Sequence, residues 1–299
     1  MNPNRLIVTA LAVATATATA TAQQDMSRVE VKAQRVAGNV YMLTGRGGNI
    51  GLSVGDDGAF LIDDQFGVLS ARILKTVSEL TPDPIRFVVN THWHGDHTGG
   101  NQKMAEAGAI LVAHENVRRA MSIDHFMAAF DRTVAASPEA ALPVVTFSES
   151  MTFHFNGDEI RVHHVAPAHT DGDAIVIFRD ANVIHMGDTY FNGMYPFIDV
   201  STGGSIAGMI AAADTALDLA DDETQFIPGH GPLSGVAELR ASRAMLQAVH
   251  NRVRALITQG RSRDEVIAAA PTREYDEAWG NGFLDPPTWV GIVYDSMIE

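Results

Sequence analysis

The stretch HWHGDH, residues 92–97, places three imidazoles and one carboxylate within six positions. Imidazole nitrogens and carboxylate oxygens are the groups with which proteins hold zinc and similar transition metals. A single histidine is usually a structural residue, but packing does not require four ligand-type side chains at this spacing. The motif therefore predicts a metal site that uses His92, His94, Asp96 and His97.

The composition narrows the class of protein. The chain has 299 residues, of which 46% are hydrophobic, so it can bury a large core. Asp and Glu (36) outnumber Lys and Arg (21), which gives a net charge of −15. This excess of negative charge argues against nucleic acid or an anionic membrane surface as a partner. We expect a small-molecule substrate instead, and the sequence predicts no particular oligomeric state.

The absence of cysteine limits the chemistry of the predicted site. With no cysteine in the chain, there is no disulfide and no thiolate ligand. Histidine, aspartate and glutamate must therefore hold any metal.

Residues 1–22 have the pattern of a secretory signal peptide. Arg5 precedes an apolar run that starts at Leu6, and the segment ends in Ala20-Thr21-Ala22, an A-x-A-like cleavage site. The run is too short to span a membrane as a stable helix. We expect cleavage near Ala22, a periplasmic or secreted mature protein, and no stable membrane insertion.

The mature chain alternates strand-like and helix-like segments in two similar halves. Short apolar runs with glycine and aspartate turns predict the strands. The predicted helices are Val68–Leu80, Glu115–Ala136, Ser205–Ala220 and Val236–Gln259. Helices need a sheet on which to bury their apolar face, so two mixed sheets with helices outside fit this order. No linker divides the halves, and we expect one α/β domain over residues 23–299, with a helical tail from about 261 to 299.

Three further ligand candidates stand after predicted strands. They are His169, Asp188 and His230, each with a glycine beside it or close by. Glycine allows backbone to approach a metal site closely, and strand ends at one sheet edge form a rigid platform for ligands on loops.

These four motifs, in this order, resemble the metallo-β-lactamase superfamily, over about residues 36–239. The resemblance implies a four-layer αβ/βα sandwich with a dinuclear metal site between two sheets. It also implies the ligand sets. One metal takes His92, His94 and His169, the other takes Asp96, His97 and His230, and Asp188 bridges them.

The resemblance also implies two zinc ions, with iron or manganese as alternatives. Three imidazoles leave an open position on a catalytic zinc. Two metals about 3.5–4 Å apart can share a hydroxide that forms near neutral pH and attacks the substrate carbonyl. Asp96 is the candidate catalytic residue, because it could also orient the hydroxide and handle its proton. Asp63 matches a position whose carboxylate hydrogen-bonds to a metal-binding histidine without binding the metal itself.

The resemblance is less specific about the substrate. Several true β-lactamases have Cys and Lys where this chain has Asp188 and Phe191. Our hypothesis is an exported dinuclear zinc hydrolase that opens a cyclic amide or ester, with β-lactams among its candidate substrates. A lactonase or thioesterase of the same fold is the alternative. A non-hydrolytic metal-binding protein and an iron redox enzyme remain as further hypotheses.

The residues that contact the substrate are predicted only from their closeness to the ligand motifs in the sequence. Phe66, Tyr190, Asn192 and Tyr195 lie near the ligand motifs and are candidates for lining a pocket. The glycine-rich loop 45–49 is either a mobile flap over the site or an ordinary hairpin turn.

Overall fold

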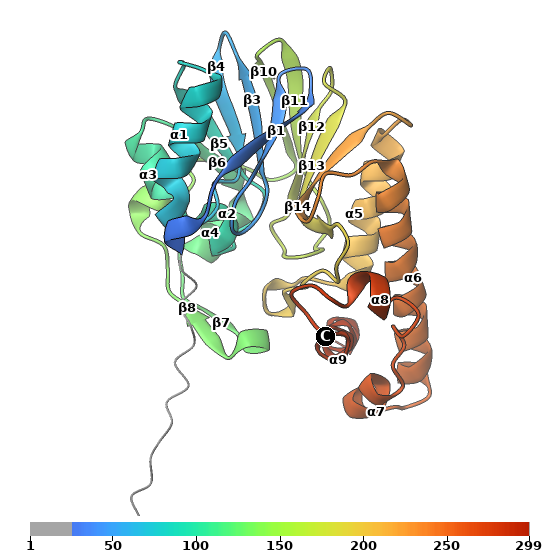
Figure 1. Ribbon diagram of the computed structural model, residues 1–299. Helices are drawn as coiled ribbons and strands as arrows, with labels where there is room; N and C mark the ends of the chain where they lie inside the picture. Colours follow the sequence, from blue (N-terminus) through green and yellow to red (C-terminus); the bar gives the residue numbers. More distant parts are fainter. Residues whose placement is uncertain (1–25, 299) are drawn as a thin grey trace, which may run out of the picture.

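The structure is a computed structural model that describes residues 26–298. The predicted signal peptide, residues 1–22, lies outside the described residues. Across the described part, the chain forms two large β-sheets that face each other between layers of helices, and a separate two-stranded hairpin (Figure 1).

The first sheet has seven strands, in the order β1-β2-β3-β4-β5-β6-β9. The strands are β1 (Lys32–Ala37), β2 (Val40–Thr44), β3 (Ile50–Gly55), β4 (Gly58–Ile62), β5 (Ile85–Asn90), β6 (Ile110–His114) and β9 (Val145–Phe147). The first four strands pair antiparallel, and β4, β5, β6 and β9 pair parallel. The sheet is therefore mixed, as the sequence predicted.

The second sheet has five strands, in the order β10-β11-β12-β13-β14. They are β10 (Ser150–Phe155), β11 (Asp158–His164), β12 (Ala174–Phe178), β13 (Val183–Phe191) and β14 (Gln225–His230). The first four pair antiparallel, and β13 and β14 pair parallel. Parallel pairing requires a crossover, which the helix α5 (Ile206–Leu219) supplies.

The alternation of side chains along each strand separates the core into layers. In β4, Phe60 and Ile62 face the second sheet, while Leu61 faces the helix α1 (Ser70–Leu80). The helix α3 (Asn101–Glu106) covers the same outer face through Met104. On the other side, α5 and α6 (Val236–Thr258) cover the second sheet. This four-layer arrangement confirms the predicted fold class.

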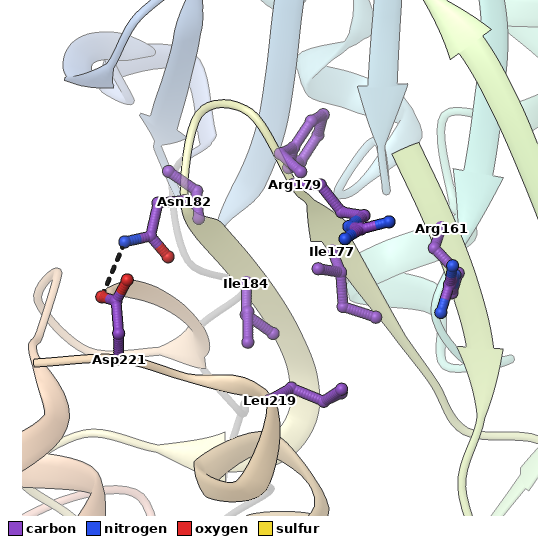
Figure 2. A pocket seen from close by; sticks show the side chains of 9 residues that line it. Arg161, Ile177, Arg179, Asn182, Ile184, Leu219 and Asp221 are labelled. Carbon is purple, nitrogen blue, oxygen red and sulfur yellow. Dashed lines mark hydrogen bonds between the residues drawn. The ribbon is translucent and has the colours of Figure 1, made fainter. Parts of the chain in front are cut away.

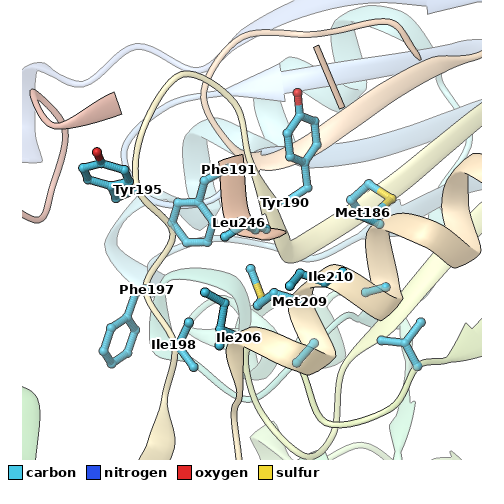
Figure 3. Close-up of a cluster of buried hydrophobic side chains, with 14 of the residues drawn as sticks. Met186, Tyr190, Phe191, Tyr195, Phe197, Ile198, Ile206, Met209, Ile210 and Leu246 are labelled. Atoms are coloured by element: carbon cyan, nitrogen blue, oxygen red, sulfur yellow. The ribbon is translucent and has the colours of Figure 1, made fainter. Parts of the chain in front are cut away.

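Three helices follow α6 and pack against the second half of the fold. They are α7 (Arg263–Ala268), α8 (Asp276–Trp279) and α9 (Pro286–Ile298). Trp289 of α9 is fully buried, stacks on Tyr195 at 4.2 Å between ring centroids, and donates from its indole nitrogen to the carbonyl oxygen of Pro196. Figure 3 shows Tyr195 close to the cluster that β13 and α5 form. These contacts fix the loop after β13, which borders the ligand motifs.

The predicted helix Glu115–Ala136 is wrong over most of its length. The helix α4 spans only Glu115–Met121, and a hairpin follows, with β7 (His125–Met127), a 3-10 turn (Ala128–Phe130) and β8 (Arg132–Val134). The spacing of the Met and Phe residues fits a helix, but the Asp124 carboxylate accepts a hydrogen bond from the amide of Ala136. Tertiary contacts of the hairpin, described below, outweigh the helical preference.

None of the helices in the described part of the chain is both long enough and apolar enough to cross a bilayer.

Candidate metal centre

The predicted ligands lie where strands of both sheets end. The HWHGDH motif follows β5, His169 lies in the loop between β11 and β12, and His230 is the last residue of β14. Asp188 lies within β13 rather than in the loop that the sequence suggested, because this strand continues to Phe191. The fold therefore brings all seven candidates to one place between the sheets.

The first group contains His92, His94, His169 and Asp188, all buried, whose ligand atoms lie within 4.8 Å of one another. Nδ1 of His94 is 2.8 Å from Nε2 of His169. An Asp188 oxygen lies 3.7 Å from Nε2 of His92 and 3.5 Å from Nε2 of His169. Three imidazoles and one carboxylate thus face a common point.

The second group contains Asp96, His97 and His230, again with ligand atoms within 4.8 Å of one another. The Asp96 carboxylate is 3.4 Å from Nε2 of His230 and 3.8 Å from Nε2 of His97. Asp188 also reaches this group, at 3.0 Å from His97 and 3.4 Å from His230. One carboxylate therefore lies between the two groups.

Asp63 and Thr91 fix the orientation of two of the imidazoles. The Asp63 carboxylate accepts from Nδ1 of His97 at 2.8 Å and from the Thr91 hydroxyl at 2.8 Å. The Thr91 oxygen lies 3.0 Å from Nδ1 of His92. Oxygen partners on the outer nitrogens leave both Nε2 atoms directed into the site. The position of Asp63 agrees with its predicted supporting role.

Asp199, which is not among the predicted ligands or their predicted partners, orients a third imidazole. Its carboxylate lies 2.9 Å from Nε2 of His94, so Nδ1 of this ring faces the site. Burial raises the pKa of Asp199, but the hydrogen bond and charge of His94, together with the hydrogen bonds from Ser201 and Thr202, outweigh burial and lower the pKa to about 2. The carbonyl oxygen of Phe197 accepts from Nδ1 of His169 at 2.7 Å. Both residues follow Asp188 within eleven positions of the sequence.

The charges in the site favour a bound cation. Burial lowers the pKa of His97, but the carboxylates of Asp188, Asp96 and Asp63 outweigh it and raise the pKa well above its ordinary value. Burial alone would raise the pKa of Asp188, yet the neighbouring imidazoles, His97 first, hold it well below its usual range. Carboxylates that stay ionised in a buried site require a positive partner.

The donor set fits a zinc-like metal. Nε2 of His92 is buried, points toward Asp188, and has no hydrogen-bond partner among the described residues. An orphaned buried nitrogen is costly unless something binds it. A divalent cation among the imidazoles and carboxylates would satisfy it, and nitrogen and oxygen ligands suit zinc, iron or manganese.

The glycine-rich loop 45–49 is fixed against the second group. The amide of Gly48 donates to the carbonyl of Asp96, and the side chain of Gln65 donates to the carbonyl of Gly48 at 2.6 Å. The side chain of Asn49 donates to the carbonyls of Pro228 and Gly231. In this structure these hydrogen bonds hold the loop in place along one side of the site.

Two of the predicted pocket residues are not at the surface. Tyr190 and Tyr195 are each 1% exposed and belong to the core cluster behind β13, since the strand and the C-terminal helices enclose them. Phe191, by contrast, stacks on His230, with 4.9 Å between the ring centroids and 24° between the planes. This ring lies where the resemblance led us to look for a lysine.

A separate cavity of about 410 Å³ lies on the second sheet and contains none of the ligand candidates (Figure 2). Arg161 and Arg179 line it, and both form ion pairs with Glu159 at 3.0 Å.

The fold and the paired ligand groups define a class of metal-binding enzymes, and comparison with known proteins places the chain within it. The family model of the metallo-beta-lactamase superfamily matches residues 43–243. The chain therefore belongs to this superfamily, as the sequence motifs indicated. The prediction of a metal-dependent hydrolase is supported by the same findings.

Individual relatives and structures are similar to large parts of the chain. A hydroxyacylglutathione hydrolase of Nitrosococcus oceani is 28% identical over 211 residues, which are 69% of this chain and 70% of the relative. A metallo-beta-lactamase from Pontibacter korlensis aligns with a TM-score of 0.61 at 18% identity, over 73% of this chain and 99% of that structure. A sec-alkylsulfatase from Pseudomonas sp. aligns with a TM-score of 0.67 at 16% identity, over 90% of this chain but only 50% of that structure. The two structures support the fold alone.

Proposed function

We propose that the protein is an exported dinuclear zinc hydrolase that opens a cyclic amide or a cyclic ester. The position of Asp188 carries this proposal. Its oxygens lie 3.0–3.7 Å from imidazoles of both ligand groups, where one carboxylate can bind two cations. His92, His94 and His169 would hold one zinc, and Asp96, His97 and His230 the other.

Zinc bound in these groups would polarise the scissile carbonyl and supply hydroxide from water near neutral pH. Addition of water to the acyl carbon breaks the acyl–nitrogen or acyl–oxygen bond and leaves a carboxylate with an amine or alcohol. The protein's own residues hold the ligand side chains in place. The buried imidazoles are held by Asp63, Thr91 and Asp199, so little reorganisation is needed during the reaction.

Asp96 is the proposed catalytic residue as well as a ligand. Its side chain is 27% exposed, more than those of Asp188 and His97, so it can meet a substrate or a water molecule. Burial raises its pKa, but His97 and His230 outweigh burial and lower the pKa to about 2. The carboxylate is therefore ionised at neutral pH and can accept a hydrogen bond from the attacking water.

Thioester hydrolysis is the second candidate. It is supported by the similarity to the hydroxyacylglutathione hydrolase, a name that describes cleavage of a glutathione thioester.

Export is supported only by the sequence of residues 1–22, in which the A-x-A-like end at Ala22 follows a short apolar run.

A hydrolysis screen of zinc-reconstituted protein tests the proposal. The panel contains β-lactams, lactones and thioesters, and we expect turnover of at least one cyclic amide or ester. His94→Ala should reduce that turnover by at least a hundredfold, whereas His154→Ala, a change at an exposed histidine of β10, should leave it unchanged. No turnover of any cyclic substrate, or full activity of His94→Ala, would refute the assignment.

A further inference from the structure

Three phenylalanine rings form a continuous row that leads from solvent to the first ligand group. Phe283, in the loop between α8 and α9, lies 5.6 Å from Phe130 in the turn of the β7–β8 hairpin, measured between ring centroids. Phe130 lies 4.9 Å from Phe197. The Phe197 ring in turn lies 5.9 Å from His94 and 5.7 Å from His169.

The exposure of these rings increases with distance from the ligands. Phe197 is 6% exposed, Phe130 37% and Phe283 64%. Phe197 therefore closes the inner end of the row, while the two outer rings present apolar surface to solvent. Large exposed aromatic side chains that meet beside a candidate catalytic centre are typical of a ligand-binding surface.

The hairpin that carries Phe130 is held against the metal motif at a second point. At its base, the ring of His125 lies 4.7 Å from Trp93, and Trp93 lies 4.6 Å from His94. Figure 1 shows β7 and β8 extending from the first half of the fold toward the C-terminal helices. Two ring contacts thus fix the hairpin on the side of His94 and His169.

We propose that Phe130 and Phe283 form the wall that binds an apolar alkyl or aryl group of the substrate, with Phe197 at its inner end. The inference rests on the proposed hydrolase function and specifies its substrate class: cyclic amides or esters that carry such a group next to the ring. A substrate whose ring reaches the ligand groups places a neighbouring substituent along this row. Burial of each methylene against the wall contributes up to about 0.8 kcal/mol, which is about a fourfold gain in affinity.

Matched substrate pairs test this wall. The pairs are γ-decalactone with γ-butyrolactone, and benzylpenicillin with 6-acetamidopenicillanic acid, so the members of each pair share the ring and its polar groups and differ in the apolar group. For each pair that the zinc-reconstituted enzyme hydrolyses, we expect kcat/KM to be at least tenfold higher for the larger member than for the smaller one. The double variant Phe130→Ala/Phe283→Ala should remove most of this difference through KM and change the smaller substrate less than twofold.

Phe126→Ala is the matched control, since Phe126 lies on the same hairpin, is 57% exposed, and has no ring contact with the row among the described residues. We expect this variant to keep the preference of the wild type. Three results would contradict the substrate-binding role of Phe130 and Phe283 without contradicting the hydrolase function. They are an equal loss of kcat/KM for both members of a pair in the double variant, an equally large effect of Phe126→Ala, and a wild-type enzyme that hydrolyses both members equally well. A wild-type dimer that dissociates in the double variant would also contradict this role, because the patch would then be a subunit interface. No turnover of any cyclic substrate would overturn the proposed function itself.

Discussion

Asp199 is the residue whose removal should weaken the first ligand group without deleting a ligand. Its carboxylate holds Nε2 of His94 at 2.9 Å and so keeps Nδ1 in the site. Loss of such an outer partner typically lowers metal affinity about 10- to 100-fold. We expect Asp199→Ala to lower zinc affinity by this factor in calorimetric titration, while Asp222→Ala, at an exposed aspartate, leaves it unchanged. Equal affinity in both variants would contradict the role of Asp199.

His185, which is not itself a ligand candidate, gives the fold a pH dependence. Its Nε2 faces the carbonyl of Asn49 at 3.2 Å, and its Nδ1 accepts from the amide of Gly187 at 3.2 Å, so both nitrogens are satisfied in the neutral ring. Burial lowers its pKa from 6.5 to about 4. A histidine whose pKa is lower in the folded than in the unfolded state stabilises the fold above pH 6.5, and this stabilisation is lost as the pH falls from 6.5 to 4.

The expected loss is about 3 kcal/mol for a shift of this size. Urea unfolding of metal-free protein between pH 7 and pH 4.5 measures it. The free energy of unfolding should fall less steeply with decreasing pH in His185→Gln than in the wild type. Parallel curves for the two proteins would show that His185 is not responsible.

Individual residues also show what could and could not be predicted from the sequence. The ligand candidates were predictable because each has a metal-binding side chain in a glycine-containing motif. Asp199 was not, because it lies eleven positions beyond Asp188, outside any motif, and only the turn after β13 brings it to His94. Tyr190 and Tyr195 were misassigned to the pocket because sequence distance from a ligand does not define whether a ring points toward the ligands or into the core.

At the scale of elements, the loop between β2 and β3 forms a wall of the second ligand group. A Cβ atom at Gly48 would lie 2.0 Å from Cε1 of His97, too close for any side chain. We expect Gly48→Ala to displace His97 and to reduce the bound zinc from two ions to about one per chain. Gly95→Ala is the control within the metal motif, since its Cβ would meet no atom within 4 Å. Elemental analysis of both variants makes the comparison, and two ions in Gly48→Ala would contradict this role of the loop.

The β7–β8 hairpin is the element that sequence reasoning missed. The Met and Phe residues between 121 and 130 match a helical period, and no glycine or proline marks the end of the helix at Ser122. The ring contacts of His125 with Trp93 and of Phe130 with Phe197 join segments far apart in the sequence, so only the folded chain reveals them. The other predicted long helices agree with α1, α5 and α6 to within a few residues.

At the scale of the whole molecule, the two-sheet sandwich was predictable from the order of strands and helices. The mixed sheets follow from the same order, because hairpins give antiparallel pairs and crossovers through helices give parallel pairs. The common edge where β5, β11, β13 and β14 present their ligands was not visible in any single segment. It explains why residues from 92 to 230 form one candidate centre.

The central claim is that the two ligand groups form a dinuclear metal centre with Asp188 between them. Elemental analysis of zinc-reconstituted wild-type protein, with Asp188→Ala measured in parallel, tests it most directly. We expect two zinc ions per wild-type chain, and one or none in the variant. A wild-type protein that retains no zinc, or an Asp188→Ala variant that still retains two ions, would contradict it.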